Sequence, residues 1–288
     1  MIYVLVPAYN EAATVGLLLW KVRSVFTAFE REYQLLVVDD CSTDGTAEVL
    51  APYERALPLT VVTHRRRRGY ARSLEELLRL AVARSDRPRR DAAVTIQADF
   101  SESPDDLPEI VKRFESGADL VLADSRDRPG RTAGERLARR LVPLLARPFA
   151  KLDRIEAGVG TLRAYRLATL SRMLGQGGPP LRTEGWAADL ELLARAEAAA
   201  RRVEVVRLSS PVRPRQRASR LQPFRALLGA ARAAPGLRRG VRPNPADDDP
   251  SSAPPPAPRR RRGRRGRRGN AGSDARPAER QPAAPGPA

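Results

Sequence analysis

The chain has 288 residues, enough for one sizeable core with a tail or a small appendage. Its 52 basic and 34 acidic side chains give a formal net charge of +18, which should attract polyanions such as nucleic acid, anionic lipid headgroups or phosphorylated substrates. A single cysteine, Cys41, excludes an internal disulfide, and no apolar run approaches the roughly 18 to 20 residues of a membrane span. No basic leader precedes the strand-like run 2–6, so we expect no signal peptide and a cytoplasmic protein, at most peripheral at the inner face of the cytoplasmic membrane.

Apolar, β-branched runs alternate with stretches of helical spacing along the first 235 residues. This alternation predicts an α/β fold, with a mainly parallel sheet covered by helices on both faces. Ligands bind beyond the carboxyl ends of the strands in such sheets, so candidate site residues should lie where the runs end. The predicted strands are 2–6, 35–39, 59–63, 92–96, 118–123 and 203–208, and the predicted helices are 12–29, 45–55, 71–84, 105–115, 133–150 and 186–200.

The first predicted strand ends in PAYNE, residues 7–11, directly before a helix. Pro7 fixes the turn and lacks an amide donor, and Tyr9 offers a flat ring face. Glu11 falls near the positive N-terminus of the helix. Two interpretations stay open for this segment, a ligand-binding turn and a helix entry with an acidic first turn.

The second predicted strand ends in VVDDCSTDGT, residues 37–46. Asp44 or Thr43 can cap the next helix, and Gly45 relaxes the turn. Capping does not explain Asp39 and Asp40, because two adjacent carboxylates repel each other unless a ligand or a cation compensates them. Such a pair at a strand end can accept hydrogen bonds from a base N–H and from ribose hydroxyls.

The fourth predicted strand ends in QADFSESP, residues 97–104. Gln97 and Asp99 are two residues apart around a strand-end turn, so they can aim two oxygen ligands at one hard cation such as Mg²⁺ or Mn²⁺. The pair gains weight because it shares a predicted sheet edge with the two clusters above. The sequence therefore predicts one site built from three strand ends.

The segments VPAYNEAATV, VVDDCSTDGT and QADFSESPDDLPEIV, in this order and spacing, resemble glycosyltransferase family 2. Within that family the chain is most similar to the polyprenol-phosphate sugar transferases of the dolichol-phosphate mannose synthase type. The resemblance covers roughly residues 2–222 and implies a GT-A fold in residues 1–235. It also implies inverting transfer of a sugar from a GDP- or UDP-linked donor to a polyprenyl or other lipid phosphate. The alternatives are a saccharide or other hydroxyl acceptor, and a pseudo-enzyme that only binds nucleotide.

The resemblance implies a role for each residue that matches the family's motifs. The nucleoside would lie against Pro7, Ala8, Tyr9, Glu11, Asp39 and Asp40. The implied catalytic residues are Asp99, which holds Mg²⁺ or Mn²⁺ together with Gln97, and Arg126 and Arg131, which reach phosphate. A later basic loop, which would close on the phosphates of donor and acceptor, contains Arg213, Arg215, Ser219 and Arg220.

Two departures from the family bear on the expected chemistry. Gln97 stands where the family usually has the first Asp of Asp-x-Asp, so the cation loses one formal charge and should bind more weakly; Glu102 is near enough in sequence to compensate. A hydroxyl acceptor would also need a carboxylate base. Glu184 is the candidate base, and an acidic helix N-terminus is the other explanation for it.

Three basic features remain open to more than one interpretation. His64, the only histidine, lacks partners for a metal site, and the arginine run 65–68 after it is either a solvated loop or a loop that faces the donor phosphates. Helix 133–150 either packs on the sheet or lies at a membrane interface.

Residues 236–288 hold 13 arginines against 5 acids, a net charge of 13 − 5 = +8, with 11 prolines, and we expect them to form a disordered tail. The tail suits an anionic membrane. Nucleic acid is the alternative partner of a different class, and we favour the membrane because the run 259–269 has no interleaved aromatics.

Overall fold

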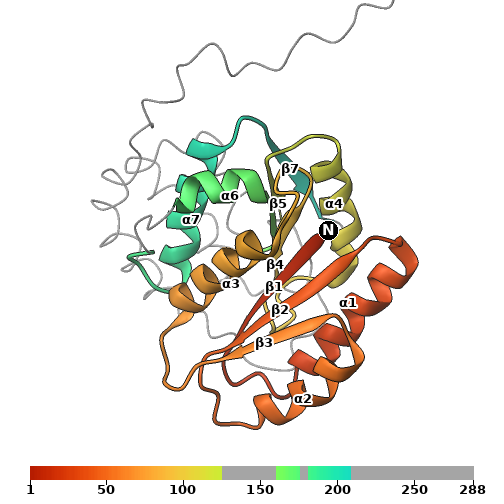
Figure 1. Cartoon of the computed structure of the whole chain (residues 1–288), viewed down its shortest axis with the longest axis vertical. Coiled ribbons are helices and arrows are strands. Elements are labelled where there is room, and N and C mark those ends of the chain that lie inside the picture. Colours follow the sequence, from red (N-terminus) through yellow and green to blue (C-terminus); the bar gives the residue numbers. More distant parts are fainter. Residues whose placement is uncertain (125–159, 176–180, 209–288) are drawn as a thin grey trace, which may run out of the picture. The chain divides into compact units, whose positions relative to one another are not determined.

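A computed structural model describes residues 1–124, 160–175 and 181–208 of the chain (Figure 1). The predicted helix 133–150 and the tail 236–288 lie outside these described residues, so the boundary at residue 235 stays a prediction. Six of the expected site residues lie outside them too, namely Arg126, Arg131, Arg213, Arg215, Ser219 and Arg220.

The described residues form one seven-stranded sheet in the order β3-β2-β1-β4-β6-β5-β7. Six strands run parallel to one another, and β6 runs antiparallel to its neighbours β4 and β5. The predicted α/β fold with a mainly parallel sheet is therefore confirmed. The strands are β1 Ile2–Ala8, β2 Tyr33–Asp39, β3 Leu59–Thr63, β4 Ala92–Thr95, β5 Leu120–Asp124, β6 Arg163–Arg166 and β7 Val203–Arg207.

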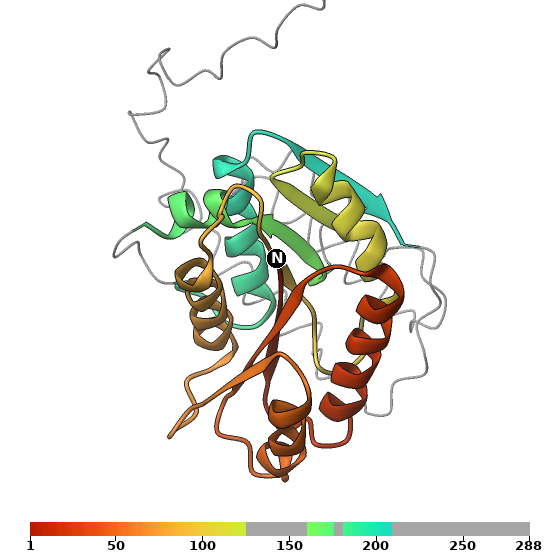
Figure 2. The ribbon, with the colours of Figure 1, turned by 45° about the vertical axis from the view of Figure 1, so that its right-hand side comes forward.

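Helices cover both faces of the sheet, as Figures 1 and 2 show. The reason lies in the strands, whose successive side chains point to opposite faces and are apolar on both. In β1, for example, Val4 and Val6 pack into the core beneath α1, α2 and α4, while Tyr3 and Leu5 pack into the core beneath α3, α6 and α7. The helices are α1 Val15–Phe29, α2 Thr46–Ala56, α3 Tyr70–Arg84, α4 Leu107–Glu115, α6 Leu167–Leu174 and α7 Trp186–Ala199, with a 3₁₀ turn at Pro104–Asp106.

The strand β6 and the helix α6 are two elements that the sequence pattern did not predict. An arginine stands at each end of β6, and such a segment lacks the apolar alternation by which half-buried strands are found. Arg163 is nevertheless only 2% exposed, because its Nη1 donates to the backbone oxygen of Asp189 at 2.8 Å. A buried arginine with an internal partner thus occupies a position that the pattern reserves for an apolar residue.

The register of the parallel strands brings their carboxyl ends to one edge of the sheet. Ala8 at the end of β1 pairs with Asp39, and Asp39 pairs with Thr63 at the end of β3. The backbone of Ile96, just after β4, donates to the oxygen of Leu5 at 3.1 Å, so the chain leaving β4 also runs beside the end of β1. The three motifs that carry the site prediction therefore leave the sheet at the same edge.

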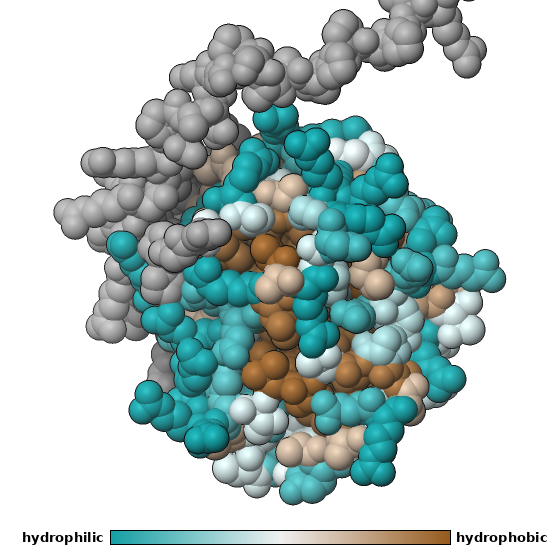
Figure 3. Space-filling view, viewed as in Figure 1, coloured by the Kyte–Doolittle hydropathy of each residue, from teal (hydrophilic) through white to brown (hydrophobic). Residues whose placement is uncertain are grey.

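Figure 3 shows one face of the described chain. In Figure 3, hydrophilic side chains surround a central area where apolar side chains gather. Within the described ranges no helix is both long enough and apolar enough to cross a bilayer.

Candidate functional site

The loops after β1 and β2 are joined by short hydrogen bonds between side chains and backbone. Asn10 lies in the left-handed region of backbone conformation, with a φ of 54°. Its backbone N–H donates to Ser42 Oγ at 2.8 Å, and its side-chain Oδ1 accepts from the backbone N–H of Thr43 at 2.8 Å. The amide of Ala12 donates to Asp44 Oδ2 at 3.2 Å. The two loops therefore form one structural unit, which we call the paired loops (residues 9–14 and 41–46).

Asp44 binds the first residue of α2, although the N-cap position itself is taken by Gly45. Its Oδ1 accepts from the amide of Thr46 at 3.2 Å and from the hydroxyl of the same residue at 2.5 Å. Partial burial raises the pKa of Asp44, but the hydrogen bonds from Thr46 and Ala12 outweigh burial and hold the pKa below its ordinary value. Gly45 has a φ of 82°, which is the relaxed turn expected of it.

Asp39 and Glu11 place buried carboxylates at the base of the paired loops. Asp39 is 1% exposed, and its Oδ1 accepts from the amide and the hydroxyl of Ser42, the former at 3.1 Å. Its Oδ2 makes no hydrogen bond within the described residues, so it remains available to a ligand. Glu11 Oε2 accepts from Thr14 Oγ1 at 2.9 Å, at the start of α1, which agrees with the interpretation as a helix entry.

Asp40 holds the loop after β3 and the start of α3. Its Oδ1 accepts from the amide of Arg68 at 2.7 Å and lies 2.6 Å from His64 Nδ1, while its Oδ2 accepts from the amide of Gly69 at 2.8 Å. The repulsion between Asp39 and Asp40 is thus compensated on the Asp40 side by the protein itself. The structure gives Asp40 an internal role, and its contact with a nucleoside stays a prediction.

His64 lies buried between two carboxylates, a role that sequence reasoning missed. Its Nε2 lies 3.0 Å from Glu76 Oε2, which also accepts from Arg68 Nη1 at 2.8 Å. Nothing in the sequence spacing links His64 to Asp40 and Glu76, because the three come from the ends of β2 and β3 and from α3.

The arginine run 65–68 reaches the same edge of the sheet. The guanidinium carbon of Arg67 lies 4.0 Å from the centre of the Tyr9 ring, a cation–π contact. The flat ring face expected at Tyr9 is therefore covered by a cation from the loop after β3. This contact favours the interpretation in which the run faces the site.

Gln97 and Asp99 are each held by hydrogen bonds. Gln97 Nε2 donates to Tyr70 Oη at 2.8 Å, and this hydroxyl donates to Asp189 Oδ1 at 2.9 Å. Asp99 Oδ1 accepts from the amide of Ser101 at 2.8 Å, around a turn in which Phe100 has a φ of 57°. Burial, followed by the charge of Asp189, raises the pKa of Tyr70 well above its ordinary value, so the hydroxyl keeps its proton.

The residues of this turn fit a cation that takes further ligands from a bound substrate. In the described chain no three His, Cys, Asp or Glu side chains come together as a complete metal site. Glu102 does not compensate for Gln97, because its two oxygens accept from the amide and hydroxyl of Thr161 at 2.7 and 2.5 Å. One carboxylate from Asp99 and one amide oxygen from Gln97 remain, which suits Mg²⁺ or Mn²⁺ completed by phosphate and water.

Glu184 lies at the N-terminus of α3. Its Oε2 accepts from the amide of Ala71 at 3.3 Å, and a Cβ added to Gly69 would lie 2.7 Å from its Oε1. A carboxylate there is stabilised by the helix dipole. Glu184 thus lies at the N-terminus of α3, whereas the sequence-based explanation assigned it to the N-terminus of α7, the helix that follows it in the chain.

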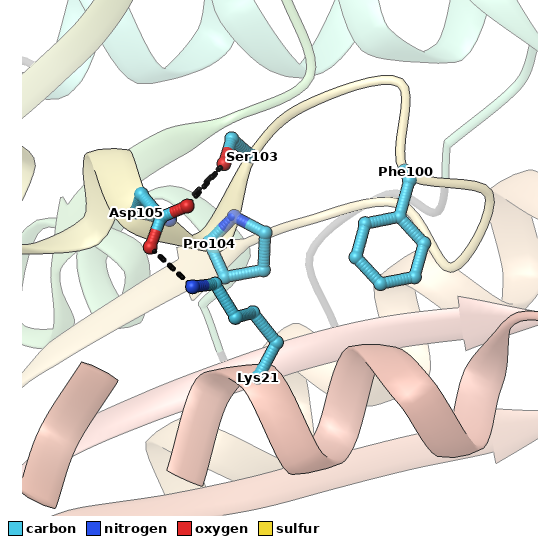
Figure 4. A pocket seen from close by; sticks show the side chains of 5 residues that line it. All are labelled: Lys21, Phe100, Ser103, Pro104 and Asp105. Atoms are coloured by element: carbon cyan, nitrogen blue, oxygen red, sulfur yellow. Dashed lines mark hydrogen bonds and ion pairs between the residues drawn. The ribbon is translucent and has the colours of Figure 1, made fainter. Parts of the chain in front are cut away.

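A small hollow beside the turn lies between α1 and residues 100–105 (Figure 4). Its polar groups contact each other: Lys21 Nζ forms an ion pair with Asp105 Oδ1 at 2.9 Å, and Ser103 Oγ donates to Asp105 Oδ2 at 3.1 Å. Phe100 and Pro104 supply its apolar wall. The hollow therefore adds no ligand-binding group to the strand-end site.

Comparison with known proteins agrees with this geometry. Residues 3–174, more than half of the chain, match the model of a family described as Glycosyl transferase family 2. The chain is 29% identical over 174 residues to the undecaprenyl-phosphate 4-deoxy-4-formamido-L-arabinose transferase of Pseudomonas paraeruginosa; the match covers 60% of this chain and 49% of that protein. The chain thus spans about half the length of the curated relatives it matches.

Two solved structures show the same fold at low sequence identity. One is glucosyl-3-phosphoglycerate synthase from Mycobacterium tuberculosis in complex with Mn²⁺, uridine diphosphate and glucosyl-3-phosphoglycerate, with 22% identity, a TM-score of 0.55, and coverage of 84% of this chain and 81% of that chain. The other is S. aureus TarS (residues 1–349) in complex with UDP-GlcNAc, with 18% identity, a TM-score of 0.50, and coverage of 71% and 55%. These likenesses confirm the expected fold class.

Proposed function

The chain belongs to glycosyl transferase family 2, and we propose that it transfers a sugar from a nucleotide-sugar donor at the edge where β1, β2 and β4 end. One observation carries the proposal. Three loops converge there, and each offers a different kind of group: the ring of Tyr9, the unpaired Oδ2 of Asp39, and the Gln97–Asp99 turn. Aromatic stacking, a carboxylate acceptor and oxygen ligands for a cation are what a base, a ribose and a diphosphate need.

In this proposal the paired loops bind the nucleoside of the donor. Asp39 Oδ2 would accept from a base N–H or a ribose hydroxyl, while its Oδ1 stays bonded to Ser42. Pro7 and Ala8 are buried at the end of β1, so they would form the floor of the site through their backbone. Arg67 would move off the ring of Tyr9 or share it with the base, since it occupies one face of that ring.

Asp99 and Gln97 would hold Mg²⁺ or Mn²⁺ against the diphosphate. The cation would offset the charge that develops on the leaving nucleoside diphosphate. The exposed arginines of the run 65–68 add positive charge at the same edge. Arg126, Arg131, Arg213, Arg215, Ser219 and Arg220 lie outside the described residues and stay predicted contacts to phosphate.

We propose a polyprenyl phosphate as the acceptor. The name of the Pseudomonas paraeruginosa relative includes undecaprenyl phosphate, which supports this class of acceptor. A phosphate is already an anionic nucleophile, so the reaction needs no general base. Glu184, the candidate base for a hydroxyl acceptor, is bonded to the start of α3, which favours the phosphate.

The location proposed for the enzyme is the inner face of the cytoplasmic membrane, with the basic tail 236–288 on the anionic lipid. Each basic residue near such a surface contributes about 1 kcal/mol. Removing the tail should leave donor binding intact and weaken binding to phosphatidylserine-containing liposomes at low salt, and the two proteins should converge at high salt. RNA tested in the same salt series separates the nucleic-acid alternative.

The decisive experiment is a turnover assay with panels of UDP- and GDP-sugars and undecaprenyl phosphate, with and without Mn²⁺. We expect release of a nucleoside diphosphate that requires both substrates, and loss of turnover in Asp99→Ala with the fold intact. Asp105→Ala is the matched control, because Asp105 lies in the next 3₁₀ turn of the chain and is paired with Lys21. Nucleotide binding without turnover would indicate the pseudo-enzyme, and no nucleotide binding would refute the site.

A further inference from the structure

Two successive hydrogen bonds connect the Gln97–Asp99 turn with the helices α3 and α7. Gln97 Nε2 lies 2.8 Å from Tyr70 Oη, and Tyr70 Oη lies 2.9 Å from Asp189 Oδ1. Gln97 follows β4, Tyr70 is the first residue of α3, and Asp189 lies in the first turn of α7. Asp189 is 8% exposed, so this end of the chain of hydrogen bonds is buried.

The chemistry of the three groups fixes the direction of these hydrogen bonds. A carboxylate can only accept, and a tyrosine hydroxyl has one proton to donate. Tyr70 gives that proton to Asp189, so its oxygen must accept from Gln97. Within the amide only Nε2 can donate, and Oε1 is therefore turned away from Tyr70. Oε1 makes no hydrogen bond within the described residues.

We infer that Tyr70 and Asp189 are positioning residues that hold the Gln97 amide in one orientation and so leave Oε1 free as a neutral ligand for the divalent cation of Asp99. The inference rests on the proposed function, because it takes Gln97 and Asp99 to share a cation. Without this hydrogen-bond chain the amide could rotate by half a turn and present Nε2, which carries two protons and cannot bind a cation.

The substitution Gln97→Asp would disturb both hydrogen bonds of Tyr70. Tyr70 would then lie between two carboxylates with one proton to share, so either position 97 or Asp189 would lose its hydrogen bond. Converting Asp189 to asparagine in the same protein removes the conflict. Tyr70 would donate to the new carboxylate and accept from the asparagine Nδ2, so the chain of hydrogen bonds would run in the opposite direction.

The double variant Gln97→Asp with Asp189→Asn has the same net charge as the wild type. Gln97→Asp adds one negative charge and Asp189→Asn removes one, so the double variant keeps the net charge of the region. This matters because Arg163 is buried beside Asp189, where its Nη1 donates to the backbone oxygen of Asp189 at 2.8 Å. Each single variant changes the charge around Arg163, and the double variant restores it.

The experiment is a double-mutant cycle on the full-length chain with two readouts, Mn²⁺ affinity in the presence of UDP or GDP and thermal unfolding without metal. We expect Gln97→Asp alone to bind Mn²⁺ at most about threefold more tightly than the wild type and to have a lower melting temperature. The double variant Gln97→Asp with Asp189→Asn should bind Mn²⁺ at least about tenfold more tightly than the wild type and regain the wild-type melting temperature. Tyr70→Phe should weaken Mn²⁺ binding. Tyr3→Phe is the matched control, because it removes a hydroxyl bonded to the backbone of Arg84, away from Gln97.

The outcomes separate this inference from the proposed function. If Asp99→Ala abolishes Mn²⁺ binding but the two substitutions of the cycle are additive in both readouts, the cation site stands and the orienting role is refuted. A Tyr70→Phe variant that is folded and binds Mn²⁺ like the wild type also refutes it. If the wild-type protein binds no Mn²⁺ with either nucleotide, the cation site fails, and the orienting role fails with it.

Discussion

The paired loops and the start of α3 lie at the same sheet edge but are built in different ways. The paired loops are held by side chains and backbone amides of their own two motifs, such as Asn10 with Ser42 and Ala12 with the carboxylate of Asp44. The start of α3 is held by carboxylates from distant parts of the chain, Asp40 and Glu184. Both regions use carboxylates as internal acceptors. Near the paired loops, however, Oδ2 of Asp39 makes no hydrogen bond within the described residues and is open to a ligand, whereas both oxygens of Asp40 bind the loop after β3 and the start of α3.

The largest effect should come from removing the carboxylate that anchors the start of α3. Asp40→Ala leaves His64 Nδ1 and the amides of Arg68 and Gly69 without their acceptor in a buried place, which should cost about 3–5 kcal/mol of unfolding free energy. Denaturant unfolding measures this loss. Asp105, which forms an exposed ion pair with Lys21, serves as control, since Asp105→Ala should change the unfolding free energy by less than about 1 kcal/mol. An equally small change for Asp40→Ala would show that its hydrogen bonds do not stabilise the fold.

The matching change at Asp39, at the base of the paired loops, should act on binding. Asp39→Asn keeps Oδ1 and its bonds to Ser42 but replaces the free Oδ2 by a donor, so nucleoside diphosphate affinity should fall by about 1.5–3 kcal/mol with little change in stability. Calorimetric titration of UDP and GDP measures the affinity. Asp40→Asn provides the contrast. If it weakens binding as much as Asp39→Asn does, without loss of stability, then Asp40 contacts the nucleoside as the sequence predicts and our division between the two regions is wrong.

A third test addresses the backbone at the start of α3. Gly69 has φ and ψ of 93° and 163°, a conformation open almost only to glycine. Gly69→Ala should therefore cost roughly 1–3 kcal/mol of unfolding free energy. The new Cβ would also press on Glu184 Oε1. Adding Glu184→Ala relieves only that contact, so the double variant should stay less stable than Glu184→Ala alone.

The smallest effect concerns acid stability of the paired loops. The folded-state pKa of Asp44 is lowered, so its contribution to stability is fully present above the pKa of the unfolded chain, about 3.9, and is lost as the pH falls through the folded-state pKa. Asp44→Asn should reduce the steepness of the stability profile below about pH 4. Thermal melts between pH 2.5 and 6 measure the profile, and an unchanged slope would show that Asp44 titrates alike in both states.

The sequence predicts the sheet and the strand-end motifs well because both depend on local patterns. Asp39, Gln97 and Asp99 lie where strand periodicity and turn chemistry place them. The partners of these residues could not be found in this way. Glu184 and Asp189 reach the start of α3 from more than 110 residues away, and no spacing rule connects them to Gly69 or Tyr70.

Buried charge explains the strand that the sequence pattern missed. Arg163 and Arg166 make β6 look like a polar loop, and only the folded structure shows their partners. Arg166 Nε donates to Asp119 Oδ1 at 2.8 Å, next to β5. Periodicity counts such residues as exposed, although an arginine with internal acceptors can lie in the core. The same limit hid the internal role of His64.

The antiparallel strand β6 also sets an order of assembly. β4 and β5 are not neighbours in the sheet, because β6 lies between them and pairs with both. During synthesis, β1 to β4 can pair as they emerge, but β5 has no partner strand until residues 163–166 have been made. At about 5–20 residues per second this leaves the apolar edge of β4 uncovered for several seconds. Pairing across so many residues also carries a loop-closure entropy that slows the step. β6 thus joins the two halves of the sheet only after β1 to β4 have been made, so docking of β6 is expected to limit the rate of folding.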